Sequence, residues 1–449
     1  MVMSMKIRIL ILLNKLITLG AKIAGKNGGV FAGSLLFRRD INALNKIIYP
    51  KYVIGVTGSS GKGSTVYTLA QILKSNGYKV VYNETGANAV RGIYTKILNS
   101  ASFFTKKINA DVLILEIDER HISLAFPKPV FTHLVITNIT RDQPPRNGHV
   151  DKIFSAIMNS INKKTHLIIN ADDPVVNEAG IIHRGRVTSF GIDQTKYSSV
   201  KSNSLCLDHA YCPVCHEKLE YAYYHYGHLG NYNCVNHCFS REPVDYRATN
   251  VDLTNKTIKI NNNLIKMDKD AFFAVYYSLA AYTAAATIGL DEEKIVNSFN
   301  KNIKESKRMH SYQYSGRSIT MIESKNENNL SYLQSINYIN NNPDLKTVII
   351  GFDNVSRRYK DNDLSWLWDV DFELLNNPKI DKFYCIGKYR FDVFNRLKYA
   401  GINQKKLILI EDINSLLKQV VSGSKGDIYT MVCFDMTDRI LNLIKEDAK

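Results

Sequence analysis

Short hydrophobic runs alternate with helix-like segments through the first half of the chain. Five such runs end at polar residues, and they lie at 52–57, 80–82, 112–115, 133–136 and 166–169. After the first of them, residues 66–73 carry hydrophobic side chains at helical spacing. Strands buried between two layers of helices read as continuous apolar runs, so the pattern predicts an α/β domain built on a parallel sheet.

The alternation changes in the second half of the chain. It breaks between about residues 198 and 245, a segment rich in tyrosine, histidine and cysteine, which we interpret as an insertion. A helix is predicted over 271–288, ended by Gly289, because glycine commonly follows the last helical turn. Further apolar runs at 346–350, at 383–386 and near Ile428 predict a second, smaller α/β domain.

A chain of 449 residues exceeds the usual size of a single hydrophobic core, so several domains are expected. We predict an N-terminal helical segment over 1–50 and a central domain over 51–305, with its insertion at about 200–245. Residues 306–449 are predicted to form the C-terminal α/β domain.

The N-terminal apolar run that begins near Met5 imitates a signal peptide. Asn14 and Lys15 interrupt the run, which favours a short amphipathic helix instead. No other stretch approaches the roughly 20 apolar residues that span a bilayer. A cytoplasmic protein without a transmembrane segment is therefore expected.

Basic residues exceed acidic ones, with 58 Lys and Arg against 42 Asp and Glu and a net charge of +16. This balance favours a polyanionic partner or an anionic membrane surface, and a generally lysine-rich composition explains it equally well. The charges are scattered, and no stripe of arginine and aromatic residues marks a nucleic-acid surface, so no nucleic-acid partner is expected. Hydrophobic residues make up 45% of the chain, which excludes a disordered protein.

A glycine-rich stretch links the first predicted strand to the helix that follows. It consists of Gly58, Ser59, Ser60, Gly61, Lys62, Gly63, Ser64 and Thr65. Glycines let backbone amides turn toward a polyphosphate, and a helix N-terminus adds partial positive charge. Lys62 is predicted to reach the β- and γ-phosphates of ATP, and Ser64 or Thr65 to bind Mg²⁺. The alternative is an ordinary glycine-rich turn with a surface lysine.

An acidic segment follows the predicted strand at 112–115 and contains Glu116, Asp118 and Glu119. A magnesium site requires a carboxylate near the carboxyl end of the sheet, and Glu116 is the predicted ligand. A solvated acidic turn is the alternative, because acidic residues after strands are common.

Two close cysteine pairs lie about 20 residues apart in the insertion: Cys212 with Cys215, and Cys234 with Cys238. This spacing is typical of a zinc ribbon, in which four ligands close a structural Zn²⁺ site. His237 beside Cys238 leaves a three-cysteine, one-histidine site open. Disulfides are disfavoured in a cytoplasmic protein. The isolated residues Cys206, Cys385 and Cys433 are predicted to be buried or inert.

Further motifs appear in the order that Mur ligases show. They lie at 83–88, 115–119, 137–138, 141–143 and 170–173. Together with the four-cysteine insertion and the segment Asp363-Leu-Ser365-Trp366, they resemble the MurT family through most of the chain. Members of that family are Mur-ligase-like subunits of lipid II isoglutaminyl synthase, and they work with the glutaminase GatD.

The resemblance implies ATP-dependent amidation of the α-carboxylate of D-glutamate in lipid II, through an acyl phosphate and with ammonia from a GatD-type glutaminase. It implies catalytic roles for Lys62, Glu116 and Asp363, the last completing the Cys-His pair of the glutaminase. Taken alone, Asp363 equally fits a helix N-cap or a turn. Lipid II lies at an anionic inner membrane surface, so a peripheral location there is also implied.

Several departures from the family pattern keep two alternatives open. Gly63 directly follows Lys62, as in folylpolyglutamate synthases, which favours a stand-alone folylpolyglutamate or Mur-type amino-acid ligase. Ala274 and Tyr277 stand where relatives carry asparagines, and Lys307 replaces a glycine, which favours a Mur-like scaffold with reduced catalysis. The four-cysteine insertion and the Asp363 segment argue against a stand-alone ligase.

Overall fold

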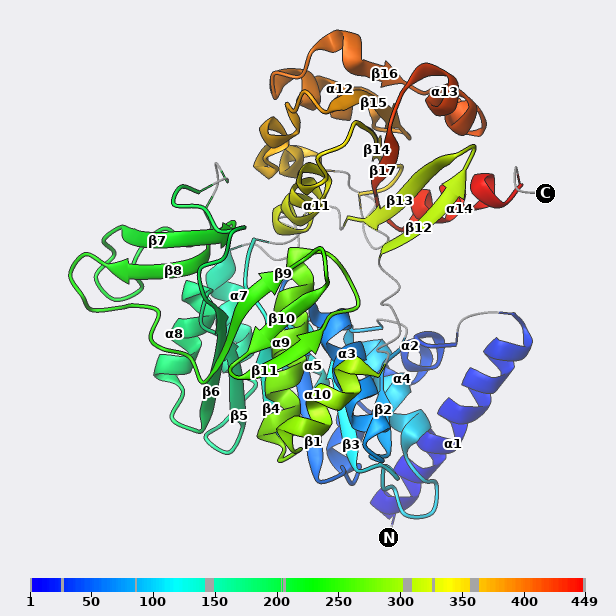
Figure 1. The fold of residues 1–449 in the computed structure, drawn as a ribbon. Coiled ribbons are helices and arrows are strands. Elements are labelled where there is room, and N and C mark those ends of the chain that lie inside the picture. Colours follow the sequence, from blue (N-terminus) through cyan, green and yellow to red (C-terminus); the bar gives the residue numbers. More distant parts are fainter. Residues whose placement is uncertain are drawn as a thin grey trace.

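The computed structural model describes residues 2–25, 28–84, 87–141, 149–202, 204, 207–301, 309–324, 328–355 and 363–446. Two α/β units lie one above the other in Figure 1, and a small hairpin projects at one side. The lower unit contains a nine-stranded sheet and the upper unit a six-stranded sheet. The predicted α/β fold class is confirmed.

The large sheet has the strand order β11-β10-β9-β6-β5-β4-β1-β3-β2. The five predicted runs form β1 (Tyr52–Thr57), β2 (Val80–Tyr82), β3 (Val112–Glu116), β4 (His133–Ile136) and β5 (His166–Asn170). These strands are parallel to one another, and the parallel part continues through β6 (Val187–Ile192) and β9 (Tyr246–Asp252). The far end is antiparallel, with β10 (Thr257–Ile260) and β11 (Asn263–Lys266), so the sheet is mixed.

Helices cover both faces of the large sheet. One layer contains α3 (Lys62–Ser75), α9 (Phe272–Thr287) and α10 (Glu292–Asn300). The other contains α4 (Val90–Ser100), η3 (Glu119–His121), α5 (Ile122–Ala125), α7 (Val150–Met158) and α8 (Pro174–Ile182). Neighbouring residues of β1 show why the strands lack polar positions, because Val53 packs into one hydrophobic cluster and Ile54 into the other.

Residues 2–48 add a helical layer beside α4, with α1 (Val2–Ile23), α2 (Phe31–Leu36), η1 (Phe37–Arg39) and η2 (Ala43–Lys46). The expectation that the first helix is short is wrong, because α1 has 22 residues and passes through Asn14 and Lys15. Asn14 is buried and donates hydrogen bonds to Thr95 O (3.1 Å) and Asn99 Oδ1 (2.9 Å). Partners on α4 therefore satisfy the amide nitrogen of this side chain, and the helix continues through it. No described helix combines the length and the apolar character needed to cross a membrane.

The upper unit is built on a sheet of order β12-β13-β17-β14-β15-β16. Its strands are β12 (Met309–Tyr314), β13 (Arg317–Glu323), β14 (Lys346–Gly351), β15 (Ile380–Ile386), β16 (Leu407–Leu409) and β17 (Asp427–Val432). Its helices are α11 (Asn329–Asn341), η4 (Ser365–Asp369), η5 (Phe372–Leu375), α12 (Arg390–Tyr399), η6 (Gln404–Lys406), η7 (Ile413–Ser415), α13 (Leu416–Gly423) and α14 (Phe434–Glu446). The boundary expected between 305 and 306 falls within 302–308, outside the described residues, and stays a prediction.

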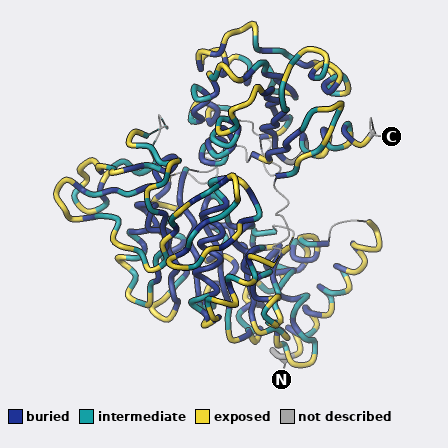
Figure 2. Tube along the Cα trace, viewed as in Figure 1, coloured by how far each residue is buried: buried dark blue, intermediate teal, exposed yellow. Residues whose placement is uncertain are grey.

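The cysteine-bearing insertion forms a separate hairpin of β7 (Leu219–Tyr226) and β8 (Leu229–Cys234). It is anchored to the segment after β5, where the Tyr232 hydroxyl donates to Ala171 O at 2.9 Å and Gly230 N donates to Asp172 O at 3.0 Å. Figure 2 shows buried residues concentrated in the two large sheets, whereas the hairpin tip and one side of α1 are exposed.

Candidate active site

The carboxyl ends of β1, β3 and β4 meet at one edge of the large sheet. β1 lies between β3 and β4, and the chain changes from one side of β1 to the other after β3. This edge is therefore a topological switch point, the usual place of ligand binding in open α/β sheets. It brings together the glycine-rich loop after β1 and the acidic segment after β3, as their sequence positions predicted.

Two glycines of the loop have backbone angles that other residues rarely adopt. Gly58 has φ +128° and Gly61 has φ +82°. A Cβ atom on Gly58 would also lie 2.3 Å from Thr137 Oγ1, so a larger residue cannot fit there. The segment after β4 holds the loop in place, because Ser59 N donates to Asn138 O (2.8 Å) and Ser60 N donates to Asn138 Oδ1 (2.9 Å).

The loop leads directly into α3, which begins at Lys62. The first amides of a helix have no intrahelical acceptor and carry partial positive charge, so this end of α3 is suited to an anion. Gly63 lies within the first helical turn, so it belongs to α3 and not to the loop. Ser64 and Thr65 are buried in the same turn, and the Thr65 hydroxyl donates to Gly61 O at 3.0 Å.

Lys62 is held inside the loop by a carboxylate that the sequence did not single out. Its Nζ donates to Glu119 Oε1 at 2.7 Å and also to Gly58 O, while Gly58 N donates to Glu119 Oε1 at 3.0 Å. Only 7% of Lys62 and 3% of Glu119 are exposed. The sequence feature that could have pointed to Glu119 is its position three residues after Glu116, just beyond the same strand.

Glu116 lies at the end of β3 beside Val56 of β1, at the expected edge of the sheet. Its Oε1 accepts a hydrogen bond from Asn88 Nδ2 at 3.0 Å, and its backbone exchanges two hydrogen bonds of 2.8 Å with the Asn83 side chain. Asn83 therefore fixes the backbone of Glu116, and Asn88 orients its carboxylate. Its predicted role as a magnesium ligand stays a prediction.

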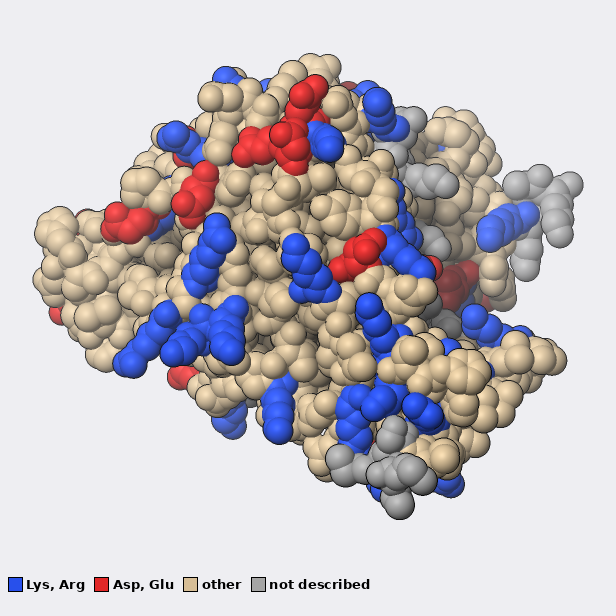
Figure 3. Space-filling view, turned by 90° about the horizontal axis from the view of Figure 1, so that it is seen from below, with Lys and Arg blue, Asp and Glu red and all other residues tan. Residues whose placement is uncertain are grey.

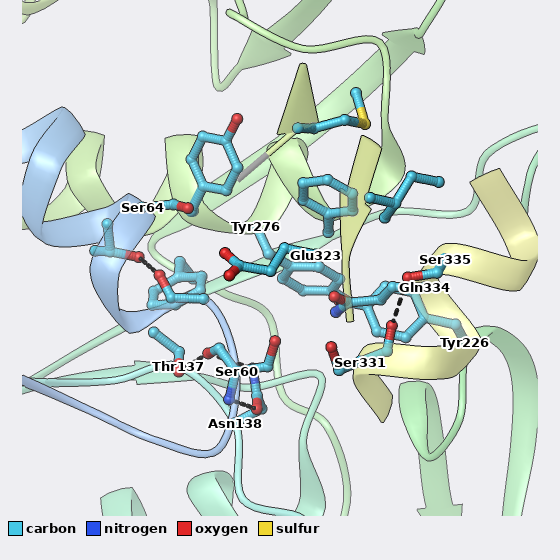
Figure 4. A pocket seen from close by; sticks show the side chains of 17 residues that line it. Ser60, Ser64, Thr137, Asn138, Tyr226, Tyr276, Glu323, Ser331, Gln334 and Ser335 are labelled. Carbon is cyan, nitrogen blue, oxygen red and sulfur yellow. Dashed lines mark hydrogen bonds between the residues drawn. The ribbon is translucent and has the colours of Figure 1, made fainter. Parts of the chain in front are cut away.

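A pocket opens beside the loop and is completed by the upper unit (Figure 4). Its lining includes Ser60, Gly61, Ser64, Thr65, Thr137 and Asn138 from the lower unit, together with aromatic side chains of β7 and α9. From the other side come Glu323 of β13 and Ser331, Gln334 and Ser335 of α11. In Figure 4 the carboxylate of Glu323 reaches into the space between Ser64 and Gln334. The sequence could not reveal this pocket, because its lining comes from separate segments scattered between residues 60 and 335.

The aromatic wall of the pocket is fixed by a buried carboxylate. Asp172 accepts hydrogen bonds from the Tyr276 hydroxyl (2.8 Å), Arg241 Nε (2.5 Å) and Ile192 N (2.9 Å). Of the positions that depart from the family pattern, Tyr277 also lines the pocket and its hydroxyl donates to Asp268, whereas Ala274 is buried in the core. Lys307 lies outside the described residues.

A buried ion pair ties the hairpin to the loop-bearing edge. His228 Nε2 lies 3.1 Å from Asp173 Oδ2, and Ile139 N of the segment after β4 donates to the same oxygen at 2.7 Å. Burial is the largest single effect and disfavours both charges. The partner's charge, the hydrogen bonds and nearby charged groups together outweigh it, so the pKa of Asp173 is lowered and the pKa of His228 is raised. The hairpin therefore supports the segment against which the glycine-rich loop packs.

The four cysteines of the hairpin converge on one point. Their Sγ atoms all lie within 4.8 Å of one another, with neighbours at 3.3 Å (Cys215 to Cys234) and 3.5 Å (Cys212 to Cys238). A disulfide requires about 2.05 Å, whereas four thiolates bound tetrahedrally to Zn²⁺ lie roughly 3.8 Å apart. Among the described residues the cluster contains Cys238 and not His237, whose Nδ1 faces Asn233 Nδ2 at 3.3 Å.

The hydrogen bonds around the cluster lower the pKa of one thiol and raise the pKa of another. A backbone hydrogen bond at Glu217 lowers the pKa of Cys215 to about 6, while the hydrogen bond with Cys215 raises the pKa of Cys238. Four thiolates this close repel one another unless a cation lies between them. The donor set therefore fits a soft divalent metal such as Zn²⁺.

Replacing Cys215 with serine is expected to release zinc and to unfold the hairpin locally. Among the described residues the hydrophobic cluster of the hairpin has five buried members, and two of them, Cys212 and Cys234, belong to the cysteine cluster itself. Structural zinc contributes about 10–16 kcal/mol to the folding of small domains. Metal content per chain and amide exchange of β7 and β8 measure the effect. His237→Ala is the matched control and should keep its zinc, so zinc loss in that variant would contradict the assignment.

Asp363 does not line the pocket beside the loop. It is exposed on the upper unit two residues before the start of η4, and its Oδ1 accepts a hydrogen bond from Ser365 N at 2.8 Å. The turn role considered for Asp363 is therefore present. Trp366, the residue after Ser365, is buried against Tyr332 and Phe352, which anchors the segment.

A surface groove lies next to Asp363. It is lined by Leu364, Leu367, Trp368, Asp392, Asn395, Lys398 and Tyr399. Trp368 and Tyr399 are 57% and 75% exposed, and their rings meet edge to face at 5.5 Å. Arg396 fixes the floor of the groove, because it donates to Leu367 O (3.0 Å) and Val370 O (2.7 Å). Exposed aromatic side chains on a rigid support are typical of protein interfaces.

Two family descriptions match separate parts of the chain. Residues 56–241 match the Mur ligase middle domain, and residues 325–436 match the MurT ligase C-terminal domain. Both units of the structure are therefore represented, and the cysteine-bearing hairpin falls within the first match.

Curated relatives and solved structures agree with this division. The chain is 28% identical over 405 residues to the lipid II isoglutaminyl synthase (glutamine-hydrolyzing) subunit MurT of Staphylococcus aureus, with 89% of each chain covered. It is 27% identical to the protein of the same name from Streptococcus pneumoniae, covering 91% of this chain and 90% of that one. A pseudomurein peptide ligase type C from Methanothermus fervidus has the same fold, with a TM-score of 0.66 at 21% identity over 91% of this chain and 81% of that one. The chain belongs to the MurT family of Mur-ligase-like proteins.

Proposed function

We propose that this chain is the ATP-dependent synthetase subunit of a glutamine-dependent amidotransferase that acts on lipid II. Its curated relatives carry that activity in their names. The observation that carries the proposal is the glycine-rich loop with Lys62 at the switch point, opening into a pocket that the upper unit completes. A ligase that activates a carboxylate needs such a pocket, because the nucleotide and the acceptor must meet there in a fixed orientation.

In the proposed reaction the α-carboxylate of D-glutamate in lipid II attacks the γ-phosphorus of ATP. ADP leaves and an acyl phosphate forms. Ammonia then attacks the acyl carbon, phosphate leaves, and the nitrogen loses a proton to give the amide of D-isoglutamine. Lys62 and the N-terminus of α3 stabilise the charge on the phosphates, because positioning and charge neutralisation dominate catalysis of phosphoryl transfer.

Ser64 and Glu116 are the proposed ligands of Mg²⁺, since hydroxyl and carboxylate oxygens are the donors that this ion prefers. Bound there, Mg²⁺ would neutralise part of the phosphate charge. Glu119 has a different proposed role. It neutralises Lys62 inside the loop, and a bound triphosphate would replace it as the partner of the Lys62 ammonium group.

The ammonia is proposed to come from a GatD-type glutaminase that docks on the groove beside Asp363. The exposed Trp368 and Tyr399 side chains support this surface as the docking site. Asp363 would orient the histidine of the glutaminase, a role that an exposed carboxylate next to an interface can fill. The zinc ribbon is proposed to be structural, because four cysteine ligands leave no position for a substrate.

Reconstitution tests this function. The purified chain, ATP, Mg²⁺ and lipid II should yield the amide with ammonium chloride, and with glutamine only after a class I glutaminase of the same organism is added. Product is followed by mass spectrometry as the change from carboxylate to amide. Absence of any glutamine-dependent product with all components present would reject the proposal.

The same assay addresses a stand-alone amino-acid ligase, which Gly63 suggested. Such an enzyme would hydrolyse ATP in response to a soluble acceptor and a free amino acid, without a glutaminase. Gly63 lies in α3 and not in the loop, so it does not distinguish the two kinds of enzyme. The match to the MurT ligase C-terminal domain favours the amidotransferase. A cytoplasmic location at the inner membrane face follows from the proposed substrate.

A further inference from the structure

One face of α1 is exposed although it is apolar. Its opposite face is buried against α4 and α2 through Ile7, Leu10, Ile11, Asn14, Thr18 and Ala21. The two hydrogen bonds from Asn14 to α4 fix the rotation of the helix about its axis. The outward face is therefore set by the fold, because turning it inward would break both hydrogen bonds and expose the buried side chains of Ile7, Leu10 and Ile11.

The outward face carries a continuous hydrophobic stripe. Its members, with their exposed fractions, are Met5 (55%), Ile9 (49%), Leu12 (44%), Leu16 (55%), Leu19 (56%) and Ile23 (79%). Their spacing of four and three residues places them on one line along the helix. Phe31 and Leu35 of α2 are 53% and 52% exposed as well. A surface helix ordinarily has polar residues here, and an extended apolar patch marks an interaction site.

A basic row runs beside the stripe. Arg8, Lys15 and Lys22 are each seven residues apart, so they lie on one flank of the helix. Residues 1–50 contain eight lysines and arginines and one acidic residue, Asp40. Asp40 is already paired with Lys46 at 2.6 Å. Seen from below, the molecule shows many Lys and Arg side chains and acidic ones in only a few places (Figure 3).

The hydrophobic stripe and the basic row together indicate what binds to this face of α1. A second copy of the chain, packed stripe to stripe, would bring basic flanks against each other without acidic residues to pair them, which opposes a helical dimer. A bilayer with anionic lipids matches both features, because acyl chains accept the apolar stripe and phosphate groups accept the lysines and arginines. The helix cannot span the bilayer, since no described helix has the required length and apolar character.

We propose that α1 binds in the plane of an anionic membrane through this stripe and its basic row. The inference depends on the geometry of α1 and not on the proposed reaction. For an enzyme with a lipid-linked substrate, such docking would raise the local substrate concentration by confining both molecules to one surface.

Sedimentation with lipid vesicles tests the proposal, using the full chain. It should bind vesicles containing phosphatidylglycerol and phosphatidylcholine in preference to phosphatidylcholine alone, and less tightly as salt rises. The combined variant Leu12→Ser, Leu16→Ser and Leu19→Ser should bind the anionic vesicles at least about tenfold more weakly, because insertion depends on the buried apolar area. All three side chains are exposed, so the fold should be kept and circular dichroism verifies it.

Leu264→Ser with Ile181→Ser is the matched control, since these exposed apolar residues lie elsewhere, on β11 and α8. The control should bind vesicles like the unchanged chain. Equal binding by the triple variant would overturn the proposal, as would failure of the unchanged chain to bind anionic vesicles at about 0.1 M salt. A change from dimer to monomer in the triple variant, without an effect on vesicle binding, would overturn it in favour of a second copy. Amidation measured with detergent-dispersed lipid II stays a separate readout, so failure here leaves the catalytic proposal standing.

Discussion

Lys62→Ala is expected to reduce ATP-dependent amide formation by about 10²–10³-fold, the range that follows loss of one preorganised charge partner in an active site. Lys62 is the buried cation of the glycine-rich loop at the switch point. Its removal leaves the developing phosphate charge without this partner, while the loop amides remain. Initial rates with ammonium chloride as the nitrogen donor measure the effect without involving a glutaminase.

The same substitution also affects stability, and a second variant separates the two effects. Without Lys62, the nearly buried Glu119 carboxylate has lost its ion-pair partner, which typically costs about 3–5 kcal/mol. Lys62→Ala combined with Glu119→Gln removes that charge, so the free energy of unfolding should recover, while the rate should stay low. Recovery of the rate in the double variant would show that Lys62 acts only through folding, and the proposed role in phosphate binding would be wrong.

Asp363→Asn is expected to abolish most glutamine-dependent amidation and to leave amidation with ammonium chloride unchanged. Replacing the aspartate of a catalytic triad by asparagine costs up to about 10⁴-fold in related hydrolytic chemistry, because the histidine loses its orientation. Asparagine keeps the Oδ1 that accepts the hydrogen bond from Ser365 N, so the turn itself should persist. Glutamate release and amide formation, measured in parallel in the reconstituted complex, give the two rates.

Asp412→Asn provides a matched control for this prediction. Asp412 is also exposed before a short helix, and its Oδ1 accepts a hydrogen bond from Asn414 N at 3.0 Å, the same arrangement as at Asp363. Both rates should be unchanged in this variant. If Asp363→Asn lowered the ammonium-dependent rate as much as the glutamine-dependent one, Asp363 would serve the synthetase chemistry or the fold rather than the glutaminase.

Local hydrophobic patterns in the sequence predicted much of the fold. The five predicted apolar runs are β1 to β5, because a strand buried on both faces tolerates no polar interruption. The helix predicted over 271–288 is α9. The antiparallel end of the sheet was not predicted, since β10 and β11 have only four residues each and their pairing depends on neighbouring strands. Asn14 does not end the first helix, because its hydrogen-bond partners lie on α4, some 80 residues away in the sequence.

At the candidate active site, the sequence by itself determined the glycine-rich loop and the two cysteine pairs, because each depends on residues close together in the chain. Only the tertiary structure decided which residues, distant along the chain, contact these motifs. Glu119 pairs with Lys62, Cys238 rather than His237 joins the cysteine cluster, and Glu323 enters the pocket from the upper unit. The tertiary structure alone also decided which face of α1 is exposed to solvent. Hydrophobic periodicity shows that a helix has an apolar stripe, but whether that stripe is buried depends on the surfaces that remain for it to pack against.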